Sequence, residues 1–419
     1  MRVVPRAEVD FRPLRSLGYL LGKPPDREVV SRFESAMEAR YPGLYAVAMP
    51  HARIGVYEML LAMEIRPGME VLLTPVTIPD VVNAILLAGL RPVFVDLGLR
   101  SCSMDLEAMS AATNARTCGI LVTHLAGFPA DMDHIASFAR ARGLFLIEDF
   151  SQAHGAFWNG SPLGTFGDGS VCSLTTLKPL CSFHGGLALV RDPRIARTLR
   201  RVSDSWATER WSTLLGWWIR DSILKVATEP LLFGHLVHPA IRRLERTRPS
   251  AVRRAQIGAF GPWKNYDDTI ARRESFPEGM FRRYSGVQAA IALHLLKDLD
   301  QRLNRRRDLG NRLLRSLQDA GVVGLPKVPP GANPGFWRLP WWPRNRTAAA
   351  VRLAQLGVDA VPTNLPCVSR EPAFQEFRVF CPNAESYCDD MLYLPLHSCM
   401  SDQDLERVVH AVASVDRSP

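Results

Sequence analysis

The feature that most constrains the fold is a regular alternation of short apolar runs and helical patterns between residues 54 and 148. The apolar runs indicate buried strands, and the segments between them carry apolar residues at helical spacing. The expected strands are 69–73, 92–95, 119–123 and 144–148, and the expected helices are 54–63, 81–88, 106–112 and 133–142. Strands that alternate with helices predict an α/β fold with a mostly parallel sheet and helices on both faces.

Two polar side chains follow apolar runs, at positions where the ends of parallel strands gather ligands. Asp149 follows the run 144–148, and Lys178 follows 173–177 and precedes Gly185-Gly186. Pyridoxal phosphate needs a lysine amine for its internal Schiff base and a carboxylate to keep its pyridine nitrogen protonated. Taken singly, a lysine is more often a solvated charge, and an aspartate after a strand more often a cap or turn residue. The residues alone leave both interpretations open.

Further motifs occur in order along the chain. They lie at 83–96, at 124–133, at 148–155 (Glu-Asp-Phe-Ser-Gln-Ala-His-Gly), at 288–290 and at 394–405. With these motifs the chain resembles the DegT/StrS family of sugar aminotransferases almost from end to end. The resemblance implies a fold type I enzyme dependent on pyridoxal 5'-phosphate, with a mostly parallel central sheet, a smaller α+β C-terminal domain, and active sites at a homodimer interface.

The resemblance also implies roles for single residues. Lys178 would form the Schiff base and carry the proton between the cofactor and the substrate carbon, and Asp149 would bind the pyridinium nitrogen. Gln152 matches the position that bonds the cofactor's phenolic oxygen, and Ser173 matches a phosphate ligand. A family branch that eliminates water has histidine in place of the lysine, so Lys178 favours amine transfer.

The sequence departs from the family at the expected phosphate site, the N-terminus of the helix near Ile54. Backbone amides and the helix dipole favour an anion there, but His51-Ala52-Arg53 replaces the usual Ser-Gly-Thr. The amides of Ala52 and Arg53 could still bind phosphate, while the Arg53 side chain would either add charge or cap the surface. Three further departures lie at cofactor-contacting positions: Ile78, Pro179 and Phe281. Together they weaken the predicted hold on the cofactor and indicate an atypical substrate.

We expect a large cofactor domain at 1–280 and a small domain at 281–419. The least family-like region is a tryptophan-rich insertion at about 204–267, in which Trp211, Leu214, Leu215, Trp218 and Ile219 recur at helical spacing. Such an apolar face needs a partner. The candidates, in order, are packing in the dimer or as a lid, docking on a membrane or lipid-linked substrate, and binding a protein. The apolar stretch 230–241 is too short to span a bilayer, which takes about 20 residues.

In the C-terminal part, the patterns predict a helix over 288–317, a strand at 336–339, and helices at 347–356 and 404–415. Asn364, His397 and the pair Trp341-Trp342 are candidates for substrate contact, and His124 for facing the cofactor. For each of them a structural role is the simpler hypothesis.

Composition adds few constraints. The net charge of +9 suits an anionic substrate such as a nucleotide-linked sugar, or merely favours solubility. Arginines are dispersed among acidic residues, which gives little support for nucleic-acid binding. The eight cysteines show no zinc spacing and are expected to be reduced, with no metal bound. No secretory pattern precedes the charged N-terminal residues, so a cytoplasmic location is expected.

The sequence therefore predicts a homodimeric aminotransferase that moves an amino group from an amino acid, most simply glutamate, to a ketone of a sugar or cyclitol. Two alternatives stay open. One is another pyridoxal phosphate reaction, such as elimination or carbon–carbon chemistry, and the other is a non-catalytic regulator that keeps the fold.

Overall fold

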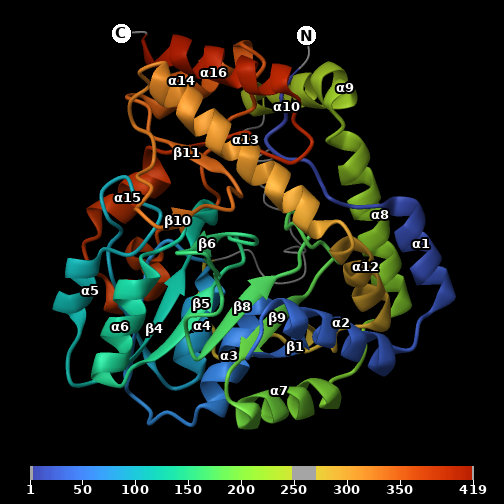
Figure 1. Cartoon of the computed structure of the whole chain (residues 1–419), viewed down its shortest axis with the longest axis vertical. Coiled ribbons are helices and arrows are strands. Elements are labelled where there is room, and N and C mark those ends of the chain that lie inside the picture. The colour runs from blue at the N-terminus through green and yellow to red at the C-terminus, as the bar shows by residue number, and fades with distance from the viewer. Residues whose placement is uncertain (1–2, 248–269, 418–419) are drawn as a thin grey trace.

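A seven-stranded sheet forms the centre of the protein in a computed structural model that describes residues 3–247 and 270–417. The strand order is β1-β9-β8-β5-β4-β2-β3 (Figure 1). The strands are β1 (Tyr45–Met49), β2 (Glu70–Leu73), β3 (Arg91–Phe94), β4 (Thr117–Thr123), β5 (Phe145–Asp149), β8 (Gly169–Ser173) and β9 (Gly186–Val190). Strand β9 runs antiparallel to β1 and β8, while the other neighbours pair in parallel. The predicted mostly parallel sheet is confirmed.

Helices surround the sheet, and the four expected between residues 54 and 142 lie close to their predicted positions. They are α1 (Pro13–Gly22), α2 (Asp26–Arg40), α3 (Ala52–Ala62), α4 (Pro79–Leu87), α5 (Leu106–Ala112), α6 (Met132–Arg142) and α7 (Pro193–Ser205). The side chains of Asp105 and Asp131 cap α5 and α6 by accepting hydrogen bonds from backbone amides of the first turn. Alternate strand residues pack into two apolar clusters, with Leu73 in one and Leu72 in the other. Both faces of the sheet are therefore covered.

A short hairpin follows β5. Its strands are β6 (Phe157–Trp158) and β7 (Ser161–Pro162), which pair antiparallel. The turn residues Asn159 and Gly160 have φ values of 45° and 80°. Positive φ at both positions is what a type I′ turn requires. On its other side, β6 pairs with β10 (Ala332–Asn333), from the C-terminal part of the chain.

The C-terminal part contains five α-helices and a two-stranded sheet among its described residues. The helices are α12 (Gly286–Leu296), α13 (Leu299–Asp319), α14 (Arg346–Gln355), α15 (Pro382–Asp389) and α16 (Asp402–Asp416), and the strands are β11 (Leu339–Trp341) and β12 (Leu392–Leu394). Figure 1 shows α13 running from α12 toward the end of the molecule that holds α14 and α16. The division into domains at residue 280 stays a prediction.

Two predictions in this part are wrong. The helix expected over 288–317 is two helices, because the chain breaks at Asp298, whose carboxylate bonds the Arg302 and Arg12 side chains. The strand expected at 336–339 begins only at Leu339. Phe336 has a φ of 49°, and the amide of Arg338 donates to the carbonyl of Ala126 instead of a neighbouring strand. Long-range backbone bonds thus override the local β pattern.

The tryptophan-rich insertion forms helices along one edge of the molecule. They are α8 (Trp211–Ala227), α9 (Pro230–Leu232), a π-helical turn (Phe233–Val237) and α10 (His238–Thr247). Helix α8 packs on α1 of the same chain (Figure 1). The indole nitrogens of Trp211 and Trp218 donate to the carbonyls of Leu20 and Pro13 at 3.3 and 2.9 Å. Part of the apolar face therefore packs on α1 of the same chain, while Trp211 and Ile219 stay 43% and 45% exposed.

Other insertion residues lie elsewhere or outside the described chain. Trp206 packs near Phe281, whereas Trp263 lies outside the described residues. In the ranges 3–247 and 270–417, no helix combines the length and apolar character needed to cross a bilayer.

Helix α8 also supports the loop that carries Lys178. Asp221 is fully buried and accepts a hydrogen bond from the Thr176 hydroxyl at 3.0 Å. Arg220 forms an ion pair with Asp221 at 2.7 Å and donates to the same hydroxyl at 2.8 Å. The ring of Trp217 packs on His184, with centroids 4.3 Å apart. The insertion thus fixes the chain two residues before Lys178.

Replacing Gly186 with alanine should destabilise the protein by about 1–3 kcal/mol, the usual cost of overpacking. The added Cβ would lie 2.3 Å from the backbone nitrogen of Ala52, which cannot rotate away. Gly216→Ala is the control, because it lies within α8 with no atom near the new methyl group and should stabilise by about 0.5–1 kcal/mol. Denaturant midpoints measure both changes. Equal effects of the two substitutions would contradict the packing of β9 on α3.

Replacing Asp221 with asparagine should lower the free energy of unfolding by about 2 kcal/mol, because Arg220 would lose its carboxylate partner in a buried setting. The matched control is Asp389→Asn, which breaks an exposed pair with Arg370 and should cost about 1 kcal/mol or less. Urea unfolding of both variants checks this. A smaller loss for Asp221→Asn than for the control would count against the α8 anchor.

Candidate active site

The structure places Asp149 and Lys178 at the same edge of the sheet. Asp149 ends β5, and the loop that follows β8 carries Lys178. Strands β5 and β8 are parallel neighbours, with Asp149 opposite Val171. Their carboxyl ends therefore lie side by side. The Asp149 carboxylate acts to raise the pKa of the Lys178 amine, so the two groups, distant in sequence, lie within electrostatic reach of each other.

Lys178 lies in a setting that disfavours its charged form. The side chain is half-buried, and its Nζ lies 4.4 Å from the centroid of the Trp337 ring. Burial lowers the pKa of Lys178 to about 8; Asp149 opposes this shift, and Arg338 and Arg306 add to it. A substantial fraction of the amine is therefore neutral near physiological pH, which is the form that attacks a carbonyl.

Gln152 and Ser173 lie on the loops that flank these two residues. The Gln152 side-chain oxygen accepts a hydrogen bond from the amide of Ala126 at 2.7 Å. The Ser173 hydroxyl lies 3.0 Å from the Thr175 hydroxyl. The Gln152 side chain is thus hydrogen-bonded to the loop after β4. Whether these residues contact a cofactor, as the sequence predicts, stays a prediction.

A glycine joins the Gln152 loop to the chain before β11. Gly127 has a φ of 88°, and a Cβ there would lie 2.6 Å from the Trp337 amide nitrogen and 2.9 Å from the Gln152 carbonyl oxygen. The indole nitrogen of Trp337 donates to the Leu177 carbonyl at 3.2 Å. Trp337 is therefore held against the residue before Lys178.

The N-terminus of α3 lies next to the glycine pair after Lys178. Gly186 fits against Ala52 because it has no side chain. Arg53 is 6% exposed, and its guanidinium bonds the Asp80 carboxylate at 2.9 Å. The surface-cap alternative for Arg53 is therefore wrong. Asp80 also bonds Arg273 at 2.6 Å, so three charged side chains share this network.

The departures from the family pattern have structural roles in this chain. The Pro179 carbonyl accepts a hydrogen bond from Arg302 at 2.8 Å, which anchors the chain after Lys178 to α13. Phe281 packs on Trp206, with ring centroids 5.5 Å apart. Ile78 precedes α4 and is half-buried.

His124 has a structural role, as the simpler hypothesis held. Its Nδ1 accepts from the Ala130 amide at 3.2 Å, and its Nε2 lies 3.3 Å from a Glu148 carboxylate oxygen. Glu148 in turn accepts from the amides of Gly164, Phe166 and Gly167. This buried network fastens β4 to β5 behind the site.

Sequence reasoning missed several residues near Lys178. His154 is buried, its Nε2 has no hydrogen-bond partner among the described residues, and burial lowers its pKa to about 3. His154 lies within the 148–155 motif, and this position could have marked it as a candidate site residue. Trp337 and Arg338 had no such signal, because their segment matched a strand pattern. Arg306, in turn, was one of many dispersed arginines.

These residues fit pyridoxal phosphate. The site offers an amine of lowered pKa, a carboxylate on the adjacent strand end, and a helix N-terminus for a phosphate. The buried, unpartnered His154 nitrogen adds a polar group with unused hydrogen-bonding capacity. Across the described residues, no three histidine, cysteine, aspartate or glutamate side chains gather in a way that could hold a metal ion.

Comparisons with known proteins agree with this geometry. The pattern of the DegT/DnrJ/EryC1/StrS aminotransferase family matches residues 27–215 and 255–413. The dTDP-4-dehydro-2,3,6-trideoxy-D-glucose 4-aminotransferase of Saccharopolyspora spinosa is 27% identical over 353 residues, which cover 83% of this chain and 78% of the relative.

Solved structures share the fold. DesV of S. venezuelae superimposes with a TM-score of 0.75 at 21% identity, covering all of both chains. NtdA of Bacillus subtilis, solved with bound cofactor PMP, gives a TM-score of 0.71 at 20% identity, covering 97% of this chain and 81% of that chain. Since the family pattern covers most of its length, the chain belongs to the DegT/DnrJ/EryC1/StrS aminotransferase family.

Proposed function

We propose that this protein transfers an amino group from an amino acid, most simply glutamate, to the ketone of a nucleotide-linked sugar, with Lys178 as the catalytic residue. As a member of its family it is an aminotransferase dependent on pyridoxal phosphate. The observation that carries the proposal is the half-buried Lys178 amine, whose pKa is lowered to about 8 beside the Asp149 carboxylate.

The side chains of the site would divide the binding of the cofactor among them. Lys178 would hold its aldehyde, Asp149 its ring nitrogen, and Gln152 its phenolic oxygen. The amides of Ala52 and Arg53, with Ser173, would hold its phosphate. When bound, pyridoxal phosphate supplies an electron-withdrawing ring that stabilises negative charge on the carbon next to the amino group.

The protein's own contribution to the chemistry is mainly proton handling by Lys178. A neutral amine at Nζ can remove the proton from the donor carbon and return it at the adjacent position. The lowered pKa keeps this base available at neutral pH. The Asp149 carboxylate would stabilise the positive charge on the ring nitrogen of the cofactor. The Trp337 ring covers Nζ of Lys178 and limits access of water to it.

Two observations support a keto-sugar acceptor that carries a phosphate group. The net charge of +9 favours anionic ligands. The relative from Saccharopolyspora spinosa is named for a dTDP-linked sugar. The proposal includes a cytoplasmic homodimer, which is supported by the family resemblance alone. A ketocyclitol would be an acceptor of the same ketone chemistry.

Lys178→Ala should abolish repeated amine transfer, with a loss of at least about 1000-fold, because the proton-transferring base is removed. The measurement is mass-spectrometric detection of the aminated sugar in a panel of nucleotide-linked ketoses supplied with glutamate. Lys297→Ala, at an exposed position after α12, should keep full activity. Multiple turnovers by the Lys178→Ala enzyme would exclude Lys178 as the catalytic base.

The rate at which cofactor-free protein takes up pyridoxal phosphate should rise about tenfold per pH unit in acid and level off above about pH 8. Only the neutral amine reacts, and burial favours that form, so the pKa is shifted down from 10.5. Stopped-flow absorbance of the lysine–cofactor linkage follows the reaction. A rate that keeps rising toward pH 10.5 would mean an unperturbed lysine.

A further inference from the structure

A second group of cationic side chains lies beside Lys178 and has no task in the chemistry above. Arg306 on α13 and Arg338 before β11 are only 5% and 7% exposed. Arg306 shares Asp10 with Arg302, which bonds the Pro179 carbonyl next to Lys178, and both Arg306 and Arg338 lower the pKa of Lys178. The Arg338 Cζ lies 4.7 Å from the centroid of the Trp337 ring, the same ring that Lys178 Nζ contacts.

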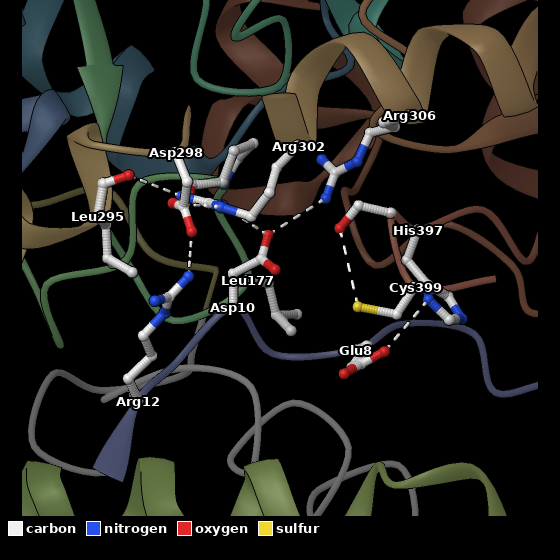
Figure 2. Close-up of polar contacts among 12 residues, drawn as sticks. Glu8, Asp10, Arg12, Leu177, Leu295, Asp298, Arg302, Arg306, His397 and Cys399 are labelled. Carbon is white, nitrogen blue, oxygen red and sulfur yellow. Dashed lines mark hydrogen bonds and ion pairs between the residues drawn. The ribbon is translucent and has the colours of Figure 1, made fainter. Parts of the chain in front are cut away.

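Their positive charge is poorly compensated within the described chain. Arg302, one turn before Arg306, bonds Asp298 and two carbonyls and lies 3.1 Å from Asp10. By contrast, Arg306 reaches only the same Asp10 at 3.7 Å, and its buried Nε has no hydrogen-bond partner in residues 3–247 or 270–417. Figure 2 shows Asp10 pointing toward both arginines.

Arg338 is the second cation of the group, and His397 is a neutral neighbour of both arginines. Arg338 donates to the Trp337 carbonyl at 3.0 Å, and no carboxylate of the described residues forms an ion pair with it. His397 is buried, and neither of its ring nitrogens has a hydrogen-bond partner in the described part of the chain. Its Nδ1 lies 3.5 Å from Glu8 (Figure 2). Burial lowers the pKa of His397 to about 3, so the ring is neutral.

Buried guanidinium groups without counter-charge are costly unless a ligand supplies an anion. The place of this group restricts which anion that is. An amino-acid donor must present its amine where Lys178 acts, and its carboxylate is attached to the same carbon. That carboxylate therefore has to lie close to Lys178. A planar guanidinium pairs with a carboxylate through two parallel hydrogen bonds.

We propose that Arg306 and Arg338, with His397, form a carboxylate-binding pocket beside Lys178 that takes the carboxylate of the amino-acid donor. The identity of the ligand rests on the proposed function, whereas the pocket rests on the buried, poorly compensated side chains. Asp10 shows that a carboxylate can approach Arg306 from the N-terminal segment.

The test measures binding of maleate, an unreactive dicarboxylate, to the cofactor-loaded protein by titration calorimetry. Arg338→Gln and Arg306→Gln should each weaken maleate binding at least about tenfold, the loss expected for a buried charged hydrogen bond. Arg305→Gln is the matched control, because this exposed neighbour bonds the carbonyls of Ser398 and Met400 instead. Its maleate affinity should equal that of the wild type.

Two further measurements distinguish the loss of a donor pocket from the loss of a nucleotide site or of the whole fold. Binding of dTDP should be unchanged in Arg338→Gln and Arg306→Gln, because the pocket takes the donor and not the nucleotide. Cofactor content, read from absorbance, and melting temperature identify a variant that is damaged as a whole. Arg338→Lys, which keeps the charge but loses the planar fork, should bind maleate with intermediate affinity.

The pocket is excluded if folded, cofactor-loaded Arg338→Gln and Arg306→Gln bind maleate as tightly as Arg305→Gln. It is equally excluded if these variants lose dTDP binding while keeping maleate, since the cations would then serve a phosphate. Maleate binding needs no turnover. A protein that binds maleate through Arg338 but transfers no amine would therefore refute the proposed function and leave the pocket intact.

Discussion

The burial of one lysine amine at the edge of a parallel sheet is the interaction on which the rest of the site depends. Removing an ammonium group from water favours its neutral form, and the nearby carboxylate of Asp149 only partly restores the charge. The sheet makes this possible, because parallel neighbours β5 and β8 end at the same edge. Strand β5 ends at Asp149, and the loop after β8 carries Lys178.

That setting is assembled from distant segments. The insertion helix α8 holds Thr176 through Asp221 and Arg220, and α13 holds the Pro179 carbonyl through Arg302. Lys178 is thus anchored on both sides by helices that lie far from it in sequence. From a third direction, Trp337 is positioned by its hydrogen bond to Leu177 and by the tight contact at Gly127. A loop so constrained keeps the amine in one place, which catalysis requires.

Two further cationic side chains, Arg306 and Arg338, act on the Lys178 amine. The positive charges of Arg306 and Arg338 lower the pKa of the lysine, and burial of such charges without counter-charge is costly. The N-terminal segment partly relieves this through Asp10, which lies near Arg302 and Arg306. A site that combines a neutral amine with buried guanidinium groups suits a ligand that brings its own negative charge.

Much of this protein was determined by local sequence. The alternating pattern predicts the strands and helices between residues 52 and 149 to within a few residues, because apolar periodicity and the aspartate caps of α5 and α6 act within single elements. Lys178 and Asp149 both follow apolar runs. Their joint role was predicted from the family resemblance, because the residues alone left both interpretations open.

Only the tertiary structure decided the rest. It broke the helix at Asp298, turned the chain at Phe336, paired the α8 tryptophans with α1 and brought Trp337, Arg338 and Arg306 to Lys178. Each of these outcomes depends on contacts between residues far apart in the chain, where the packing of one segment on another outweighs local preference.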